Sequence, residues 1–267
     1  MASRKKGITE TALVLRTCSA DMKSYGGFQW PDEVGAVVEA PDWKANNECG
    51  NGLHGWLFGH GDHSCSSSVM EAGAKWLVVE VALPESIALG GKVKFQRCII
   101  RHIGDKASAT EFILSHEPRS AEVAVIGASR QVGDNEIVQV GAIGTASAGD
   151  YGTASAGDYG TASAGNGGTA SAGDGGTASA GYKGTASAGN GGTASAGDGG
   201  TASAGYKGTA SAGNGGTASA GNGGEIHIRY WDAKAERYRT AVGYIGEKRL
   251  KPNTPYKLND QHRFVQA

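Results

Sequence analysis

The chain has 267 residues, which is enough for two or three domains, and its 45 glycines are concentrated in one stretch of the sequence. Its formal net charge of −1 argues against general binding to nucleic acid or to an anionic membrane. No apolar run is long enough to span a membrane, and the N-terminus lacks the apolar core of a signal peptide. The four cysteines are widely spaced in the first hundred residues, which suits a reducing compartment such as the cytoplasm.

Residues 1–120 predict a compact α+β domain. Segments 11–18, 76–83 and 92–102 are rich in β-branched residues or alternate between apolar and polar residues, as strands do. A short helix is expected over 105–114, because an aspartate able to cap it precedes a run with an apolar face.

A segment rich in glycine, histidine and cysteine, 49–65, is the part of this domain that suggests chemistry. Three interpretations stay open: a metal site, a pocket in which His54 on a glycine-flanked turn does acid–base or binding work, or a tight turn with a hydrogen-bonded structural histidine. The candidate metal ligands are Cys49, His54, His60, His63 and Cys65, although their spacing matches no standard zinc motif. Neither enzymatic activity nor a bound cofactor is expected. His54 is the one candidate catalytic residue.

The same domain resembles an uncharacterised domain of phage and prophage proteins. The resemblance rests on residues 17–22, 27–31, 49–55 and 91–95, with Cys-Gly-Asn-Gly-Leu-His at its centre. It implies an origin in a mobile element and names no activity.

Residues 121–224 contain an octapeptide, Gly-Thr-Ala-Ser-Ala-Gly plus two variable residues, written ten times from Gly144 onwards. In an extended chain its Thr and Ser point to one side and its Ala residues to the other, and Gly-x-x-Gly supplies a turn. This pattern predicts a β-solenoid. A flexible linker has a similar composition, but a linker needs no strict period.

The number of units in each coil can be two or three. The variable pairs repeat every 24 residues, from Asn166 to Asn190, as three units would require, although duplication of a block leaves the same trace. An interior lined by alanine alone would be hollow in a three-sided coil, so we favour two units and about six coils over 125–224. The larger apolar residues within 123–143 are expected to form the first coils.

The outward Thr and Ser residues are the candidate binding residues, because they would form regular ladders of hydroxyl groups on both broad faces. They are Thr145, Ser147, Thr153, Ser155, Thr161, Ser163, Thr169, Ser171, Thr177, Ser179, Thr185, Ser187, Thr193, Ser195, Thr201, Ser203, Thr209, Ser211, Thr217 and Ser219. The unit resembles the octapeptide of bacterial ice-nucleation proteins, in which a solenoid displays Thr-x-Thr ladders. Here serine stands in place of the second threonine.

Residues 225–267 end the repeat. Two alternating segments, 225–232 and 237–246, flank a short turn and predict a β-hairpin that caps the last coil. The expected fold is therefore mainly β: a small α+β domain, a solenoid and a β-hairpin cap.

Three functions are compatible with this organisation. The first is a structural or interaction protein of phage origin, whose rigid solenoid displays a regular surface or separates two end domains. The second is a module that binds ice or another polymer through its hydroxyl ladders. The third is an enzyme or ligand-binding domain around His54. The partner would be a protein or polymer surface, or a second copy through the flat faces, and the protein would reside in the host cytoplasm or the virion.

Overall fold

The computed structural model describes residues 10–267, which form two compact units; the first ends at Ala128 and the second begins at Ser129. The expectation that no signal peptide is present concerns residues 1–9 and lies outside the described part. The division of the chain into 1–120, 121–224 and 225–267 stays a prediction.

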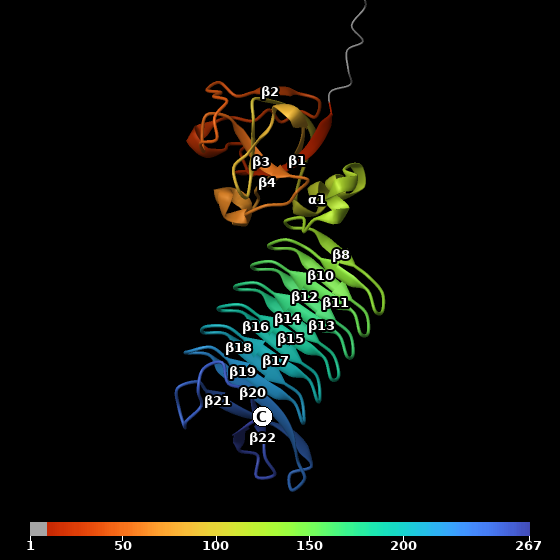
Figure 1. The fold of residues 1–267 in the computed structure, drawn as a ribbon, viewed down its shortest axis with the longest axis vertical. Helices are drawn as coiled ribbons and strands as arrows, with labels where there is room; N and C mark the ends of the chain where they lie inside the picture. Colours follow the sequence, from red (N-terminus) through yellow and green to blue (C-terminus); the bar gives the residue numbers. More distant parts are fainter. Residues whose placement is uncertain (1–9) are drawn as a thin grey trace, which may run out of the picture. The chain divides into compact units, whose positions relative to one another are not determined.

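The first unit is built on a seven-stranded antiparallel sheet with strand order β2-β7-β4-β1-β3-β6-β5 (Figure 1). Its strands are β1 Thr11–Cys18, β2 Val37–Glu39, β3 Leu53–Leu57, β4 Lys75–Ala82, β5 Ile87–Ala88, β6 Val93–Phe95 and β7 Arg97–Gly104. Short 3-10 turns lie at η1 Tyr25–Gly27, η2 His63–Cys65, η3 Ser67–Met70, η4 Leu83–Glu85 and η5 Pro118–Glu122.

The helix α1, Lys106–His116, begins at the predicted cap. The Asp105 carboxylate accepts a hydrogen bond from the Ser108 backbone N–H, and the Ser108 hydroxyl accepts one from the Asp105 backbone N–H. Ala109 and Ile113 are fully buried where the helix packs on β1, β4 and β7. The buried Glu117 carboxylate accepts the Leu13 backbone N–H at 3.0 Å and so joins the helix end to the central strand.

Two sequence expectations in this unit are corrected. The predicted strand 92–102 is two strands, because the chain leaves its pairing with β3 after Phe95 and pairs with β2 and β4 from Arg97 onwards. His54 lies inside strand β3 and not on a turn, with Lys94 of β6 opposite it. The glycines around His54 had suggested a turn, but Gly55 allows a close approach of strands: a Cβ there would lie 2.8 Å from the Leu15 carbonyl oxygen.

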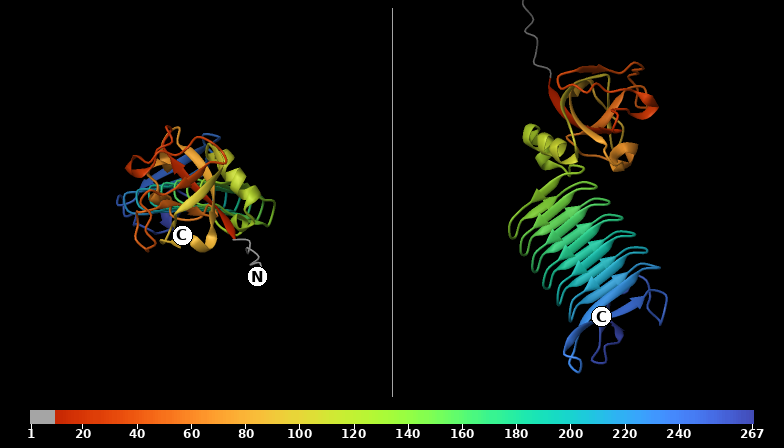
Figure 2. Two further views of the ribbon diagram at one scale, coloured as in Figure 1. Left: turned by 90° about the horizontal axis from the view of Figure 1, so that it is seen from above. Right: turned by 180° about the vertical axis from the view of Figure 1, so that it is seen from behind.

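The second unit is a β-solenoid with two parallel sheets of short strands, closed by antiparallel strands at its C-terminal end (Figures 1 and 2). The first sheet contains β8 Ser129–Gln131, β10 Thr145–Ala148, β12 Thr161–Ala164, β14 Thr177–Ala180, β16 Thr193–Ala196, β18 Thr209–Ala212, β20 Glu225–Asp232 and β21 Arg237–Tyr244. The second contains β9 Ile137–Gln139, β11 Thr153–Ala156, β13 Thr169–Ala172, β15 Thr185–Ala188, β17 Thr201–Ala204, β19 Thr217–Ala220, β22 Tyr256–Leu258 and β23 Phe264–Gln266.

Each coil contains two octapeptide units, as favoured from the sequence, and there are about six coils. Thr145 pairs with Thr161, sixteen residues on, and Thr153 pairs with Thr169 in the other sheet. The first solenoid strand is β8, whereas the buried Val125 and Ile126 belong to the first unit.

The C-terminal cap continues the first sheet. Ile226 and Ile228 of β20 lie in register with Ala210 and Ala212, and both isoleucines are buried. They fill the end of the interior with larger side chains, and β21 then pairs antiparallel along the whole of β20, which confirms the predicted hairpin. The segment after it adds the short strands β22 and β23 to the other sheet.

Candidate functional site

The two broad faces of the solenoid each carry a two-dimensional array of hydroxyl groups. On the first sheet the threonine column runs Thr145, Thr161, Thr177, Thr193 and Thr209, with a serine column two residues along each strand. The second sheet repeats this arrangement from β11 to β19. Strand geometry spaces the hydroxyls by ~4.8 Å between strands and ~6.7 Å along a strand. The structure therefore brings all twenty predicted Thr and Ser positions together on these two faces.

The interior between the two sheets holds only small side chains in its central rows. The first inward alanine of every repeat, such as Ala162 and Ala178, is 0% exposed. Glycine allows both the tight turn and the close approach of the coils: a Cβ on Gly160 would lie 2.8 Å from the Gly157 carbonyl oxygen of its own turn and 3.1 Å from the Gly144 carbonyl oxygen of the preceding coil. A larger residue at either kind of position would push the two sheets apart.

Side chains at the turns connect each coil to the next. The Asp150 carboxylate accepts the Asn166 backbone N–H at 2.7 Å, and the Asn166 side-chain oxygen accepts the Tyr182 N–H at 3.0 Å. The opposite edge has the same arrangement, in which Asp174 accepts the Asn190 N–H at 2.7 Å. At each edge the Asp and Asn side chains of successive turns thus form a column of hydrogen bonds. These turn columns hold the strands in register and so align the rows of hydroxyl groups.

The ends of the two faces differ in chemistry. On the first sheet the column ends at Glu225 and His227, and the Thr209 hydroxyl donates to the Glu225 carboxylate at 3.2 Å. On the second sheet the column begins with Ile137, which is 79% exposed. The regular array is therefore confined to the consensus repeats.

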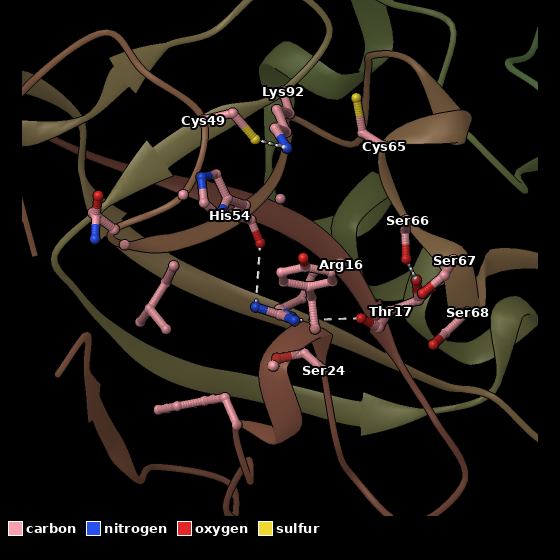
Figure 3. A pocket seen from close by; sticks show the side chains of 18 of the residues that line it. Arg16, Thr17, Ser24, Cys49, His54, Cys65, Ser66, Ser67, Ser68 and Lys92 are labelled. Atoms are coloured by element: carbon pink, nitrogen blue, oxygen red, sulfur yellow. Dashed lines mark hydrogen bonds between the residues drawn. The ribbon is translucent and has the colours of Figure 1, made fainter. Parts of the chain in front are cut away.

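A second candidate site is a cavity of about 890 Å³ in the first unit, which contains His54, Cys49 and Cys65 in its wall (Figure 3). Its other charged lining residues are Arg16, Asp42 and Lys92. Strand β3 positions His54, and β1, which pairs with β3, positions Arg16. Arg16 was not among the candidates from the sequence, since one cation within an apolar strand belongs to no motif.

Charge and burial set the protonation of these groups. Burial, followed by the positive charges of Lys92, Arg16 and Lys94, lowers the pKa of His54 to about 4, so its ring is neutral at pH 7. The Lys92 ammonium donates to the Cys49 sulfur at 3.0 Å and lowers the pKa of that thiol. Burial raises the pKa of the Cys65 thiol.

The candidate metal ligands do not form one cluster. His60 contacts the Ala124 carbonyl oxygen through Nδ1 at 3.1 Å, and His63 lies at the start of η2 with its Nδ1 4.0 Å from the Asp62 carboxylate. Within residues 10–267, no group of three or more His, Cys, Asp or Glu side chains is placed to hold a metal ion.

The fold and the hydroxyl arrays define a class, the β-solenoids that display a repeated polar surface. Comparison with known proteins adds to this. The chain is 40% identical over 109 residues to the ice nucleation protein InaU of Pantoea ananas, an alignment covering 40% of this chain and 10% of that protein. It is 38% identical over 117 residues to an ice nucleation protein of Pseudomonas syringae, covering 43% of this chain and 10% of the relative. The similarity is to the repeat region of these proteins.

The chain thus spans about a tenth of the length of these relatives. A relative in Xanthomonas campestris pv. translucens is 35% identical over 113 residues, covering 42% of this chain and 7% of its own length. Residues 12–115 match a family described as a domain of unknown function, DUF7666. No solved structure matches the chain. Among the described residues no helix has the length and apolar character needed to cross a membrane.

Proposed function

We propose that the solenoid is an ice-binding module that holds ordered water on its two hydroxyl faces. The observation that carries this proposal is the in-register stacking of Thr and Ser on two parallel sheets. A rigid array of this kind fixes many water-binding groups before binding, so little conformational entropy is lost on contact with a crystalline surface. The names of the similar proteins describe ice nucleation and no enzymatic reaction, which supports a role for the repeat as a surface.

The experiment measures thermal hysteresis and droplet freezing temperature for the purified chain and for a variant with charges on both faces. Thr177 and Thr185 lie in the third row of the consensus repeats on the first and second sheets. In Thr177→Lys/Thr185→Lys the long side chains interrupt both arrays, and we expect loss of the effect on ice.

The matched control is Gly191→Lys/Gly199→Lys. It adds the same two charges at the turn position where Lys183 and Lys207 already occur, with similar φ angles. This control should retain the effect on ice. If the parent chain has no effect on ice growth or freezing, ice binding is excluded. If the control loses as much of the effect as the face variant, the hydroxyl faces are not the binding surface.

A rigid scaffold is the second candidate, favoured by the turn columns that join successive coils. In that role the hydroxyl faces would contact a protein or polymer surface, or a second copy of the chain, and the resemblance of the N-terminal domain to phage and prophage proteins supports a place in a virion. Analytical ultracentrifugation tests self-association: a concentration-dependent dimer that Thr177→Lys/Thr185→Lys abolishes supports it, and a strict monomer excludes it. Genes for virion components beside the coding gene would support the phage origin, and their absence would count against it.

A further inference from the structure

We propose that the cavity of the first unit binds a small molecule carrying a phosphate group, which Arg16 and Lys92 hold. The cavity volume of about 890 Å³ is in the range of pockets that enclose nucleotide-sized ligands. Four features of the cavity support this: an unpaired buried cation, a neighbouring imidazole without a hydrogen-bond partner, the balance of charge among the lining residues, and the hydroxyl groups that line the cavity.

Arg16 is a buried cation without a carboxylate partner. It is 7% exposed, and its guanidinium donates only to the carbonyl oxygens of His54, at 3.2 Å, and Thr17, at 3.4 Å (Figure 3). One face of the guanidinium stacks on the Trp30 ring, with 3.7 Å from its central carbon to the ring centroid. A guanidinium has five N–H donors, so these contacts leave donors unused, and Nε is buried without a partner.

A buried charge of this kind is unfavourable unless an opposite charge compensates it. In the described part of the chain no acidic side chain forms a salt bridge with Arg16. A bound anion would supply the missing negative charge. A hydrophobic residue of similar size would fill this place at lower cost, so a buried cation without a charged partner is the place where an anionic ligand would be stabilised most.

His54 is the second polar group that lacks a partner. Its Nε2 atom is buried and forms no hydrogen bond, although its backbone carbonyl already accepts from Arg16. Two under-satisfied polar side chains therefore lie beside the same cavity. The neutral ring adds a hydrogen-bonding group without adding a charge that would repel Arg16.

The charged groups and the hydrogen-bond donors that line the cavity favour a phosphate group as the ligand. Arg16 and Lys92 outnumber the single lining carboxylate, Asp42. The hydroxyl groups of Ser24 and of the run Ser66, Ser67 and Ser68 also line the space, and Ser66 is held by a 2.6 Å hydrogen bond to Thr17. A tetrahedral dianion accepts hydrogen bonds from a guanidinium, an ammonium and several hydroxyls together, whereas a planar carboxylate has only two oxygens to share among them.

The test is isothermal titration calorimetry of the full chain at constant ionic strength, with AMP, inorganic phosphate, adenosine and acetate as probes. We expect saturable binding of AMP, with adenosine and acetate bound at least tenfold more weakly. Binding of inorganic phosphate as tight as that of AMP would support recognition of the phosphate alone. No saturable binding of either phosphate probe, or acetate bound as tightly as phosphate, would overturn the proposal.

Variants locate the site. Arg16→Gln and Lys92→Met should each weaken AMP binding at least tenfold, whereas Arg97→Gln should leave it unchanged, since Arg97 pairs with Glu39 and does not line the cavity. Lys92 is only partly buried and bonds to Cys49, so Lys92→Met decides the question even if Arg16→Gln does not fold. Equal AMP affinity in the parent and in Lys92→Met would contradict the proposal.

Discussion

Single methyl groups set the thickness of the solenoid. Each central row has an inward alanine that is fully buried, and the two sheets close over it without space for a larger side chain. The bulkier inward residues, such as Val138 and Ile226, lie only in the first and last rows, next to the ends of the stack. The interior is therefore uniform where the hydroxyl arrays are regular, and it holds larger side chains at its ends.

Ala178→Leu should destabilise the solenoid by about 1–3 kcal/mol or more, because three extra carbon atoms must separate two sheets in contact. Urea unfolding followed by circular dichroism measures the change. The control is Thr177→Leu on the same strand, where the side chain is exposed and the expected change is within about 0.5 kcal/mol. Equal stability of Ala178→Leu and the parent would show that the interior has free space.

His54 should make the stability of the first unit depend on pH. Its pKa is about 4 in the folded state and 6.5 in the unfolded state, so the unfolded chain binds more protons between these values. The neutral ring makes its full contribution to the free energy of unfolding above pH 6.5, and this contribution is lost as the pH falls towards 4. Burial also lowers the pKa of His102, so in phosphate-free buffer His54→Gln should reduce, and not abolish, this slope of the free energy of unfolding with pH. His116→Gln, which replaces an exposed histidine, should leave the slope unchanged. A parent stability that is flat over this window would contradict the assignment.

At the level of elements, the turns do more than reverse the chain. Strands of four residues make few hydrogen bonds each, and the columns of Asp and Asn add bonds from one coil to the next at both edges. The columns are interrupted at Tyr182 on one edge and at Tyr206 on the other, because tyrosine has no acceptor that reaches the next backbone. In a coil of sixteen residues these two tyrosines lie on opposite edges and do not stack.

Removal of one column member tests this contribution. Asp150→Ala should lower the free energy of unfolding by about 0.5–1.5 kcal/mol, because the Asn166 backbone N–H loses its acceptor at 2.7 Å. Amide hydrogen exchange should show faster exchange at Asn166 in particular. Asn214→Ala serves as the control, because Asn214 lies at the last turn of its column. It should lower the free energy of unfolding by less than Asp150→Ala does. Unchanged exchange at Asn166 would mean that water replaces the carboxylate without loss.

The elements that could be predicted from the sequence are those determined by residues close together in the chain. The period of eight, the alternation of Ala with Thr and Ser, and the cap at Asp105 each act over a few residues, and the structure confirms the solenoid, its two units per coil and the helix. The break between β6 and β7 depends on which distant strands pair, and the cavity depends on side chains brought together from β1, β3 and the segment around Ser66. The unpaired state of Arg16 is a property of three-dimensional surroundings, which no spacing along the chain encodes.

At the level of the whole molecule, the solenoid is a stack in which each coil contacts only its neighbours. Its free energy of unfolding is then approximately the sum of a contribution from each coil and a contribution from each interface between adjacent coils, as in other repeat proteins. The two ends are closed differently, by the short strands β8 and β9 at one end and by β20 to β23 at the other.

Deletion of residues 177–192, one full coil, should leave a folded solenoid with a moderately lower unfolding midpoint, since one interface is lost and both ends are kept. Circular dichroism and urea unfolding measure the result, and the remaining repeat strands should stay protected in hydrogen exchange. The control is a deletion of 177–180, which removes one strand and leaves its turns, and which should unfold the stack. Loss of folding in the full-coil deletion would show that the coils are not interchangeable.

The sixteen-residue coil also has a consequence for heredity. If the coils are interchangeable, as the deletion experiment tests, a change of the gene by a multiple of sixteen codons within the repeat adds or removes a whole coil and keeps both faces in line. The area of the hydroxyl faces can then grow or shrink between generations without a new fold having to be found.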